Sequence, residues 1–271
     1  MLSVIKSRYR YPIILLRQMV ITDFKLRYQG SVLGYLWSLI KPLALFGILY
    51  LVFVKFLKIG ADIEGFPIYL LLGIVLWTYF TEVTSQGVRA ILDKDELIRK
   101  VNFPRYVIVL STAVSALINL VLNLIVVLVI MFLTGFMVET GWLNLLIVAF
   151  LIVELFVFSF SVALILSALY VKFRDLIYIW EVVLQAAFYA TPILYPLSMV
   201  PTNVAKVMLM NPMAQIIQDF RYWLITPDTV TFEQLFGSGL YRIIPFAITL
   251  LTAIVALWYF RKRTMYFAEE V

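Results

Sequence analysis

Long runs of apolar residues with almost no charge constrain this chain more than any other feature. A run of about 18 or more such residues is long enough to cross a bilayer as a helix. Only 14% of the residues are charged, whereas a soluble domain has about a quarter. We therefore predict an all-α, polytopic membrane protein with six spans, at residues 32–57, 66–90, 107–132, 143–170, 177–195 and 243–260.

The basic residues predict the orientation of these spans. With both termini on one side, that side receives sixteen of the 22 Lys and Arg residues and the other side receives five, while Lys41 stays within the first span. Cytoplasmic loops carry the excess of basic residues in membrane proteins, so both termini are predicted to be cytoplasmic. We expect one domain overall, with a cytoplasmic interface segment at 1–31 followed by the six-span part at 32–271.

The N-terminal segment is predicted to form an amphipathic helix from Pro12 to about Tyr28, because proline is well placed in a first helical turn. Apolar residues at steps of three and four make one stripe, consisting of Ile13, Leu16, Val20, Phe24 and Tyr28. Such a helix lies in the membrane interface, with its apolar face in lipid and its cations near the headgroups. Its simplest function is that of a membrane anchor, with lipids as its partners.

A short charged segment at residues 92–105 separates the second and third predicted spans. It carries charges of both signs around Leu97 and Ile98, and it is predicted to form a short helix that ends near Asn102 and Pro104. A charge run of this kind is usually a solvated connector. A docking surface for a partner is the alternative.

Several chemistries are excluded by composition. The chain has no Cys and no His, which excludes disulfides, thiol chemistry, His-based metal sites and His general bases. It carries no Gly-rich phosphate-binding loop of the ATPase type. We expect no catalytic residues, no metal and no cofactor on this chain, and we take the net charge of +6 as a sign of topology rather than of nucleic-acid binding. An ion-driven transporter is disfavoured because no internal repeat is visible.

Five sequence motifs, in order along the chain, resemble those of the permease subunit of ABC-type polysaccharide exporters, the family that moves O-antigen, capsule, teichoic acid and rhamnan chains. They lie at residues 27–37 with Lys41-Pro42, at 97–105, at 172–175, at 191–196 and at 211–212. Lys41 stands where the family has asparagine. The resemblance implies a half-transporter in a bacterial cytoplasmic membrane that pairs with a second copy of itself and with two cytoplasmic ATPase subunits. ATP and Mg would bind to those subunits, and the substrate would be a lipid-linked glycan.

The resemblance also implies where the ATPases dock. The charged segment becomes the main coupling helix, and the connection between the fourth and fifth spans becomes a smaller contact. The residues implied are Asp95, Glu96, Leu97, Arg99, Lys100, Asn102, Phe103, Pro104, Arg105, Lys172, Arg174 and Asp175.

Aromatic stripes on three predicted spans are candidates for the lining of a glycan path. The C–H faces of sugars stack on aromatic rings, and their hydroxyls bond to Tyr and Trp. Helix packing and interfacial belts are the commoner use of aromatic residues in membranes, so both interpretations remain open. The candidates are Phe46, Tyr50, Phe53, Trp77, Phe80, Trp180, Phe188 and Tyr195.

The long connection before the last span completes the prediction. By resemblance it re-enters the membrane as a helical pair that closes the outer end of the path, with Pro192, Pro196, Asn211 and Pro212 as gate residues. An external loop is the alternative, although the apolar run at 207–210 favours burial. The predicted function is export of a lipid-linked polysaccharide, and the second candidate is export of a drug or small hydrophobic molecule.

Overall fold

The computed structural model describes residues 2–27, 30–60, 63–101, 103–136, 141–264 and 267. Tyr28, the predicted end of the first helix, and Asn102, one of the predicted coupling residues, lie outside this part of the chain. Within it the protein is all-helical, without a β-strand.

Long helices form the body of the molecule and shorter ones connect them. The long helices are α1 (Leu2–Arg27), α3 (Phe66–Ala90), α5 (Tyr106–Leu133), α6 (Trp142–Lys172) and α11 (Ile243–Thr264). Helix α2 (Trp37–Leu49) continues directly from the 3-10 turn η1 (Gly34–Leu36) and runs on into the π-helical segment η2 (Tyr50–Phe56). The shorter elements are η3 (Leu92–Lys94), α4 (Asp95–Lys100), α7 (Leu176–Ala190), η4 (Leu197–Met199), α8 (Thr202–Leu209), α9 (Pro212–Leu224), α10 (Phe232–Phe236) and η5 (Gly239–Arg242).

Five helical segments among the described residues are long and apolar enough to cross a membrane, which confirms a polytopic membrane protein. The fifth predicted span corresponds to α7, which has 15 residues. At about 1.5 Å per residue it is roughly 22 Å long, shorter than a hydrocarbon core of about 30 Å. It ends because Thr191, which precedes a proline, is extended with φ −97° and ψ 139°. Six spans therefore remain a prediction.

Helix α3 is the centre of the bundle, and most of its side chains are buried. It packs against α5 on one side and α6 on the other. A Cβ atom added to Gly87 would lie 2.6 Å from the Cβ of Ala163 on α6. Small residues at such crossings let membrane helices approach closely, and here they bring α3 and α6 into direct backbone proximity.

The predicted start of the N-terminal helix is wrong, because α1 begins at Leu2 and contains Pro12 in its interior. An internal proline removes one backbone hydrogen bond, but flanking helical residues can continue past it. Helix α1 packs on α5 through its middle, where Met19 is buried, while Ile13 and Ile21 remain exposed. Exposed apolar residues on one face and packed residues on the other suit a helix at a membrane surface.

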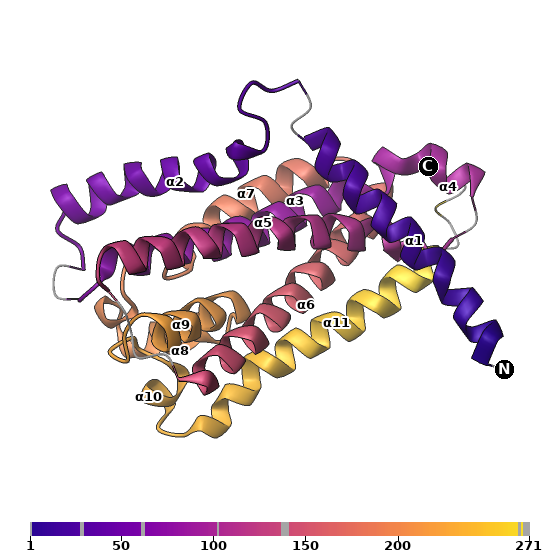
Figure 1. Cartoon of the computed structure of the whole chain (residues 1–271). Coiled ribbons are helices and arrows are strands. Elements are labelled where there is room, and N and C mark those ends of the chain that lie inside the picture. The colour runs from indigo at the N-terminus through magenta and orange to yellow at the C-terminus, as the bar shows by residue number, and fades with distance from the viewer. Residues whose placement is uncertain are drawn as a thin grey trace.

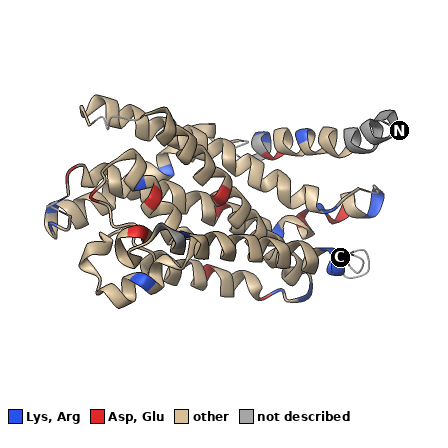
Figure 2. Ribbon diagram, turned by 90° about the horizontal axis from the view of Figure 1, so that it is seen from below, with Lys and Arg blue, Asp and Glu red and all other residues tan. Residues whose placement is uncertain are grey.

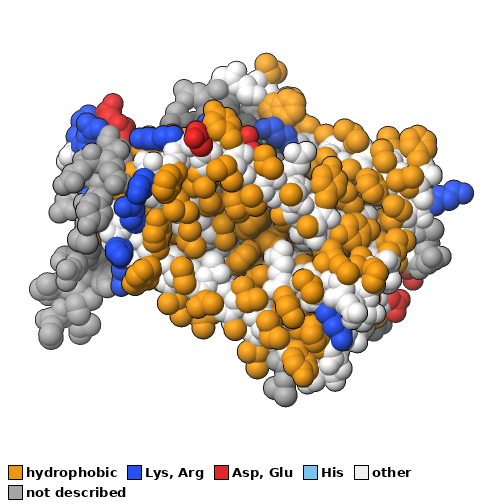
Figure 3. Space-filling model, turned by 180° about the vertical axis from the view of Figure 1, so that it is seen from behind, with side chains coloured by type: hydrophobic (Ala, Val, Ile, Leu, Met, Phe, Trp, Pro, Cys, Tyr) orange, Lys and Arg blue, Asp and Glu red, His pale blue; other side chains and the backbone are white. Residues whose placement is uncertain are grey.

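The elements divide between two ends of the bundle. Figure 1 shows α4 and the C-terminal end of α11 near α1 at one end, and α8, α9 and α10 together at the other. Lys and Arg residues, marked blue on the ribbon of Figure 2, are more frequent at the end that carries α4 than at the opposite end. Hydrophobic side chains cover the middle of the face seen in Figure 3. This is the surface expected of a protein with lipid around its middle.

Candidate coupling and translocation site

Helix α4 presents a charged face to solvent and an apolar face to the bundle. Glu96, Arg99 and Lys100 are exposed, whereas Ile98 is buried and Leu97 is half-buried against the main core. The Glu96 carboxylate and the Lys100 ammonium lie 3.0 Å apart at the surface. An i,i+4 pair of this kind supports a short helix by a few tenths of a kcal/mol. The helix therefore sits as a fixed, charged projection.

The residues after α4 fasten this projection to the bundle. Phe103 is buried in the main core, and the Arg105 guanidinium donates a hydrogen bond to the backbone carbonyl of Thr264 at the end of α11. Pro104 between them is exposed. Phe103 and Arg105 thus contact their own chain, and the ATPase contact that the family resemblance implies for them stays a prediction.

A polar network missing from the sequence prediction joins α1 to the charged segment. Lys94 forms a 3.0 Å ion pair with Asp23 of α1, and the Ser111 hydroxyl of α5 donates to the other oxygen of that carboxylate at 3.2 Å. Both partners of the ion pair are half-buried, with side-chain exposures of 29% and 17%. Next to it, burial raises the pKa of Asp93, against the opposing effect of the Arg89 and Lys94 cations.

The connection between α6 and α7 is a second exposed projection. Lys172, Arg174 and Asp175 are all exposed, as predicted for a contact with solvent or a partner. Phe173 is 54% exposed between them, and a groove of about 410 Å³ lies alongside. Phe173 belongs to the motif at residues 172–175 but is not among the predicted coupling residues. A large apolar ring in a charged turn is the signal that would have identified it.

Five aromatic rings form a cluster between α3, α6 and α7. Trp77 lies 5.4 Å from Phe80 and 5.9 Å from Phe188, and Phe80 lies 5.7 Å from Phe158 and 6.4 Å from Trp180, measured between ring centroids. Trp77 and Phe80 are buried. Within one chain these rings pack helices together, so their predicted role in lining a path stays a prediction.

The remaining predicted lining residues also contact their own chain. Phe46 and Phe53 of the first span pack against the main core, and the Tyr50 ring lies 5.8 Å from that of Phe46. The Tyr195 hydroxyl donates to the backbone carbonyl of Tyr189 at 3.0 Å.

The outward face of α7 carries a polar stripe, of which the sequence alone singles out only Glu181 as a charge that must face water or protein. Tyr178, Glu181, Gln185 and Tyr189 follow one another at helical steps of three and four, and all are exposed. Their signal was the spacing of polar residues along an otherwise apolar helix. A carboxylate facing lipid costs on the order of 3 kcal/mol, so this face is expected to meet water or protein.

Two of the predicted gate residues, Asn211 and Pro212, lie at the junction of α8 and α9, and the other two precede α8 in the chain. Asn211 caps α9 by accepting a hydrogen bond from the Met213 amide at 3.1 Å, and Pro212 occupies the first turn. Pro192 and Pro196 are buried at the start of the connection. Helix α9 itself is almost wholly buried, which agrees with a segment packed into the bundle and not with an external loop. Re-entry of α8 and α9 into the membrane stays a prediction.

Arg221 holds α9 to helix α3 and to the non-helical segment that follows α7. Its guanidinium is fully buried and donates to the backbone carbonyls of Tyr69, Pro192 and Ile193 at 3.1, 2.6 and 2.9 Å. It also lies 3.5 Å from the centroid of the Tyr69 ring. A Cβ atom on Gly73 would come within 2.5 Å of this guanidinium, so glycine leaves the space that the arginine occupies.

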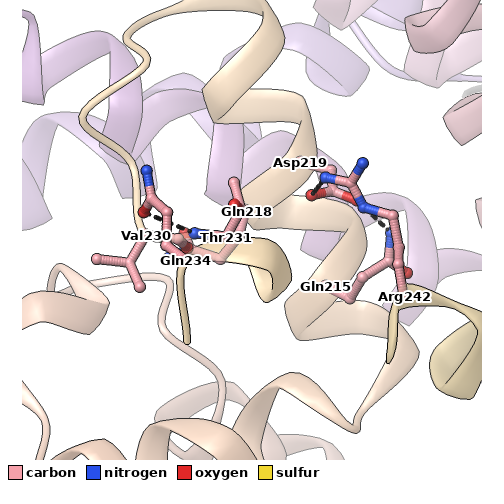
Figure 4. Close-up of polar contacts among 7 residues, drawn as sticks. All are labelled: Gln215, Gln218, Asp219, Val230, Thr231, Gln234 and Arg242. Carbon is pink, nitrogen blue, oxygen red and sulfur yellow. Dashed lines mark hydrogen bonds and ion pairs between the residues drawn. The ribbon is translucent and has the colours of Figure 1, made fainter. Parts of the chain in front are cut away.

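Asp219 and Gln218 tie α9 to η5, just before the last helix, and to the loop that follows α9. Figure 4 shows Asp219 paired with Arg242 at 2.9 Å and accepting from the Gln215 amide at 2.6 Å. The Gln218 amide donates to the carbonyl of Val230 at 3.2 Å. Hydrogen bonds on both sides fix the position of α9. No group of acidic residues suited to a metal ion occurs in the described parts of the chain.

Apolar helices around a packed aromatic cluster, with two charged projections, define a polytopic membrane protein. The family model "ABC-2 type transporter" matches residues 14–225, and the chain belongs to that family. The chain is 30% identical to an O-antigen export system permease protein RfbA of Klebsiella pneumoniae, over 98% of both chains. It is 32% identical to the Myxococcus xanthus protein of the same name, over 82% of this chain and 84% of the relative. Membership of this family implies that an ABC ATPase subunit is the partner.

Proposed function

We propose that this chain is the permease subunit of an ATP-driven exporter that moves a lipid-linked polysaccharide, such as O-antigen or a related surface polymer, across the bacterial cytoplasmic membrane. A complete transporter would hold two copies of the chain and two separate ATPase subunits, which bind ATP and Mg. Both termini would face the cytoplasm.

The charged projection at α4 carries the mechanical part of this proposal. Glu96, Arg99 and Lys100 point outward, while Phe103 and Arg105 fix the same segment to the core and to α11. A force applied by a partner at α4 is therefore delivered to packed helices instead of being absorbed by a loose loop. The relationship to O-antigen permeases along the full length of the chain supports the choice of substrate class.

The polar face of α7 supports a path between two copies. Tyr178, Glu181 and Gln185 are exposed on a helix of a membrane protein, and such groups favour water over lipid. Facing the same stripe of a second copy across a channel would hydrate them. Tyrosine and glutamine side chains also offer the hydroxyl and amide groups that a sliding glycan exchanges for water.

Depletion in the native host tests the function directly. Placing the gene under a repressible promoter is expected to remove surface glycan and to leave lipid-linked glycan inside the cell. Expression of the intact chain from a plasmid should restore the surface polymer. Normal surface glycan after full depletion would refute the proposal.

A further inference from the structure

A cavity of about 510 Å³ opens among the helix ends beside the charged projection. Its walls come from Asp23 of α1, the last two turns of α3, the η3 turn, the start of α5 and the first turns of α7. It is therefore at the predicted cytoplasmic end, and its size falls in the range of about 300–1,000 Å³ typical of small-molecule sites.

The lining of this cavity mixes an aromatic ring with donors and acceptors of several kinds. Trp180 and Glu181 come from α7, Gln86 and Arg89 from α3, and Thr112 from α5. An indole offers a flat apolar surface, a carboxylate accepts hydrogen bonds, an amide does both, and a guanidinium donates. A sugar ring has the matching combination of apolar C–H faces and hydroxyls that both donate and accept.

We propose that this cavity binds one or two neutral sugar residues of the exported glycan before they enter the path. This inference rests on the proposed function and adds a recognition site to it. The site would let the permease itself select a glycan by its sugars.

The charge of the wall favours a neutral sugar over a phosphate group. Three carboxylates line the cavity, those of Asp23, Asp93 and Glu181, against the two cations of Arg89 and Lys94. Lys94 is already paired with Asp23 at 3.0 Å. An anion would therefore meet a net negative surface and be repelled by it.

Photo-crosslinking in glycan-producing cells tests the proposal. A benzophenone amino acid at position 112 is expected to give an adduct that carries glycan, and the adduct should vanish in cells that cannot assemble the polymer. The same group in place of Thr252, on α11 and outside the cavity wall, should give no glycan adduct. A 112 variant that still exports glycan but yields no adduct, or that yields only phospholipid adducts, would overturn the cavity proposal while leaving the proposed function intact.

Direct binding gives a second test that does not depend on export. The purified permease–ATPase complex in nanodiscs would be titrated with an oligosaccharide released from the host's surface glycan, with saturation-transfer NMR as the readout. The combined changes Gln86→Ala and Thr112→Val, both in the cavity wall and outside the polar stripe of α7, are expected to weaken binding about tenfold, since each removes hydrogen bonds to a ligand. Glu233→Gln, an exposed change on α10, should have no effect. Equal binding by the native complex, the double variant and the Glu233→Gln variant would refute the inference.

Discussion

Arg221 shows how much a single buried residue contributes to the outer end of the molecule. It satisfies three backbone carbonyls from two segments that are far apart in sequence, and Gly73 makes room for it. Arginine suits this position because its planar guanidinium holds several donors in a fixed arrangement. In the sequence, Arg221 is one of the five basic residues counted on the side opposite the termini, and such a count carries no information on long-range contacts.

Replacing Arg221 by alanine is expected to destabilise the protein by about 3–5 kcal/mol, because buried acceptors lose their partner. The melting temperature in detergent, followed by intrinsic fluorescence, should fall by about 10 °C. Arg261→Ala, an exposed change on α11, is the control and should melt like the native protein. If Arg221→Ala also melts like the native protein, the guanidinium network has no stabilising role.

Helix α1 and the charged projection act as one unit at the scale of elements, because Asp23 and Lys94 join them while Ser111 links both to α5. We expect Asp23→Lys to keep the fold, since a partly exposed ion pair contributes only about 1 kcal/mol. The altered complex should hydrolyse ATP but export less glycan, because the link between the projection and α1 is lost. Export by the double exchange, Asp23→Lys with Lys94→Asp, should recover towards the native level. No recovery would show that the ion pair is not what couples the elements.

The two faces of α4 should respond differently to substitution. Changing Glu96, Arg99 and Lys100 together to alanine is expected to reduce co-purification of the ATPase without lowering the melting temperature, because these side chains are exposed. Phe103→Ala should lower the melting temperature, since deleting a buried aromatic ring costs about 3–5 kcal/mol. Retention of the ATPase by the triple variant would place the docking surface elsewhere.

Elements differ in how far they could be predicted. The long apolar helices α3, α5, α6 and α11 were found from composition alone, since their length and hydropathy leave no alternative. The predicted start of α1 is wrong, because a proline such as Pro12 occurs both in the first turn of a helix and, at a cost, in its interior. The length of α7 was overestimated, because hydropathy continues past Thr191 although the backbone there is extended.

At the scale of the whole molecule, the polar stripe on α7 predicts which face meets a second copy. The chain has no native cysteine, so single cysteines can be introduced without interference. Cysteine in place of Gln185 is expected to give covalent dimers with a short bis-maleimide reagent in native membranes. Cysteine in place of Ile254, exposed on α11, should give few. If the variant with cysteine at position 254 forms covalent dimers and the variant with cysteine at position 185 forms none, the proposed arrangement is contradicted.

The candidate site was only partly accessible from sequence. Motif order identified the charged projection, and the structure places its exposed charges and buried anchors on opposite sides. The aromatic stripes were visible as patterns, but periodicity does not distinguish a face toward a neighbouring helix, such as that of Trp77 and Phe80, from a face toward a path. The Asp23 network and the cavity beside it depend on tertiary contacts between distant segments, so no local pattern reveals them.

Reconstitution tests the central claim most directly. Purified permease and its ATPase, placed in vesicles loaded on the outer leaflet with lipid-linked glycan, are expected to move the glycan to a position protected from added glycosidase when ATP is supplied. Vesicles that contain either subunit alone should give no protection. Glycan that remains fully accessible in complete vesicles, while the same complex hydrolyses ATP, would contradict the account.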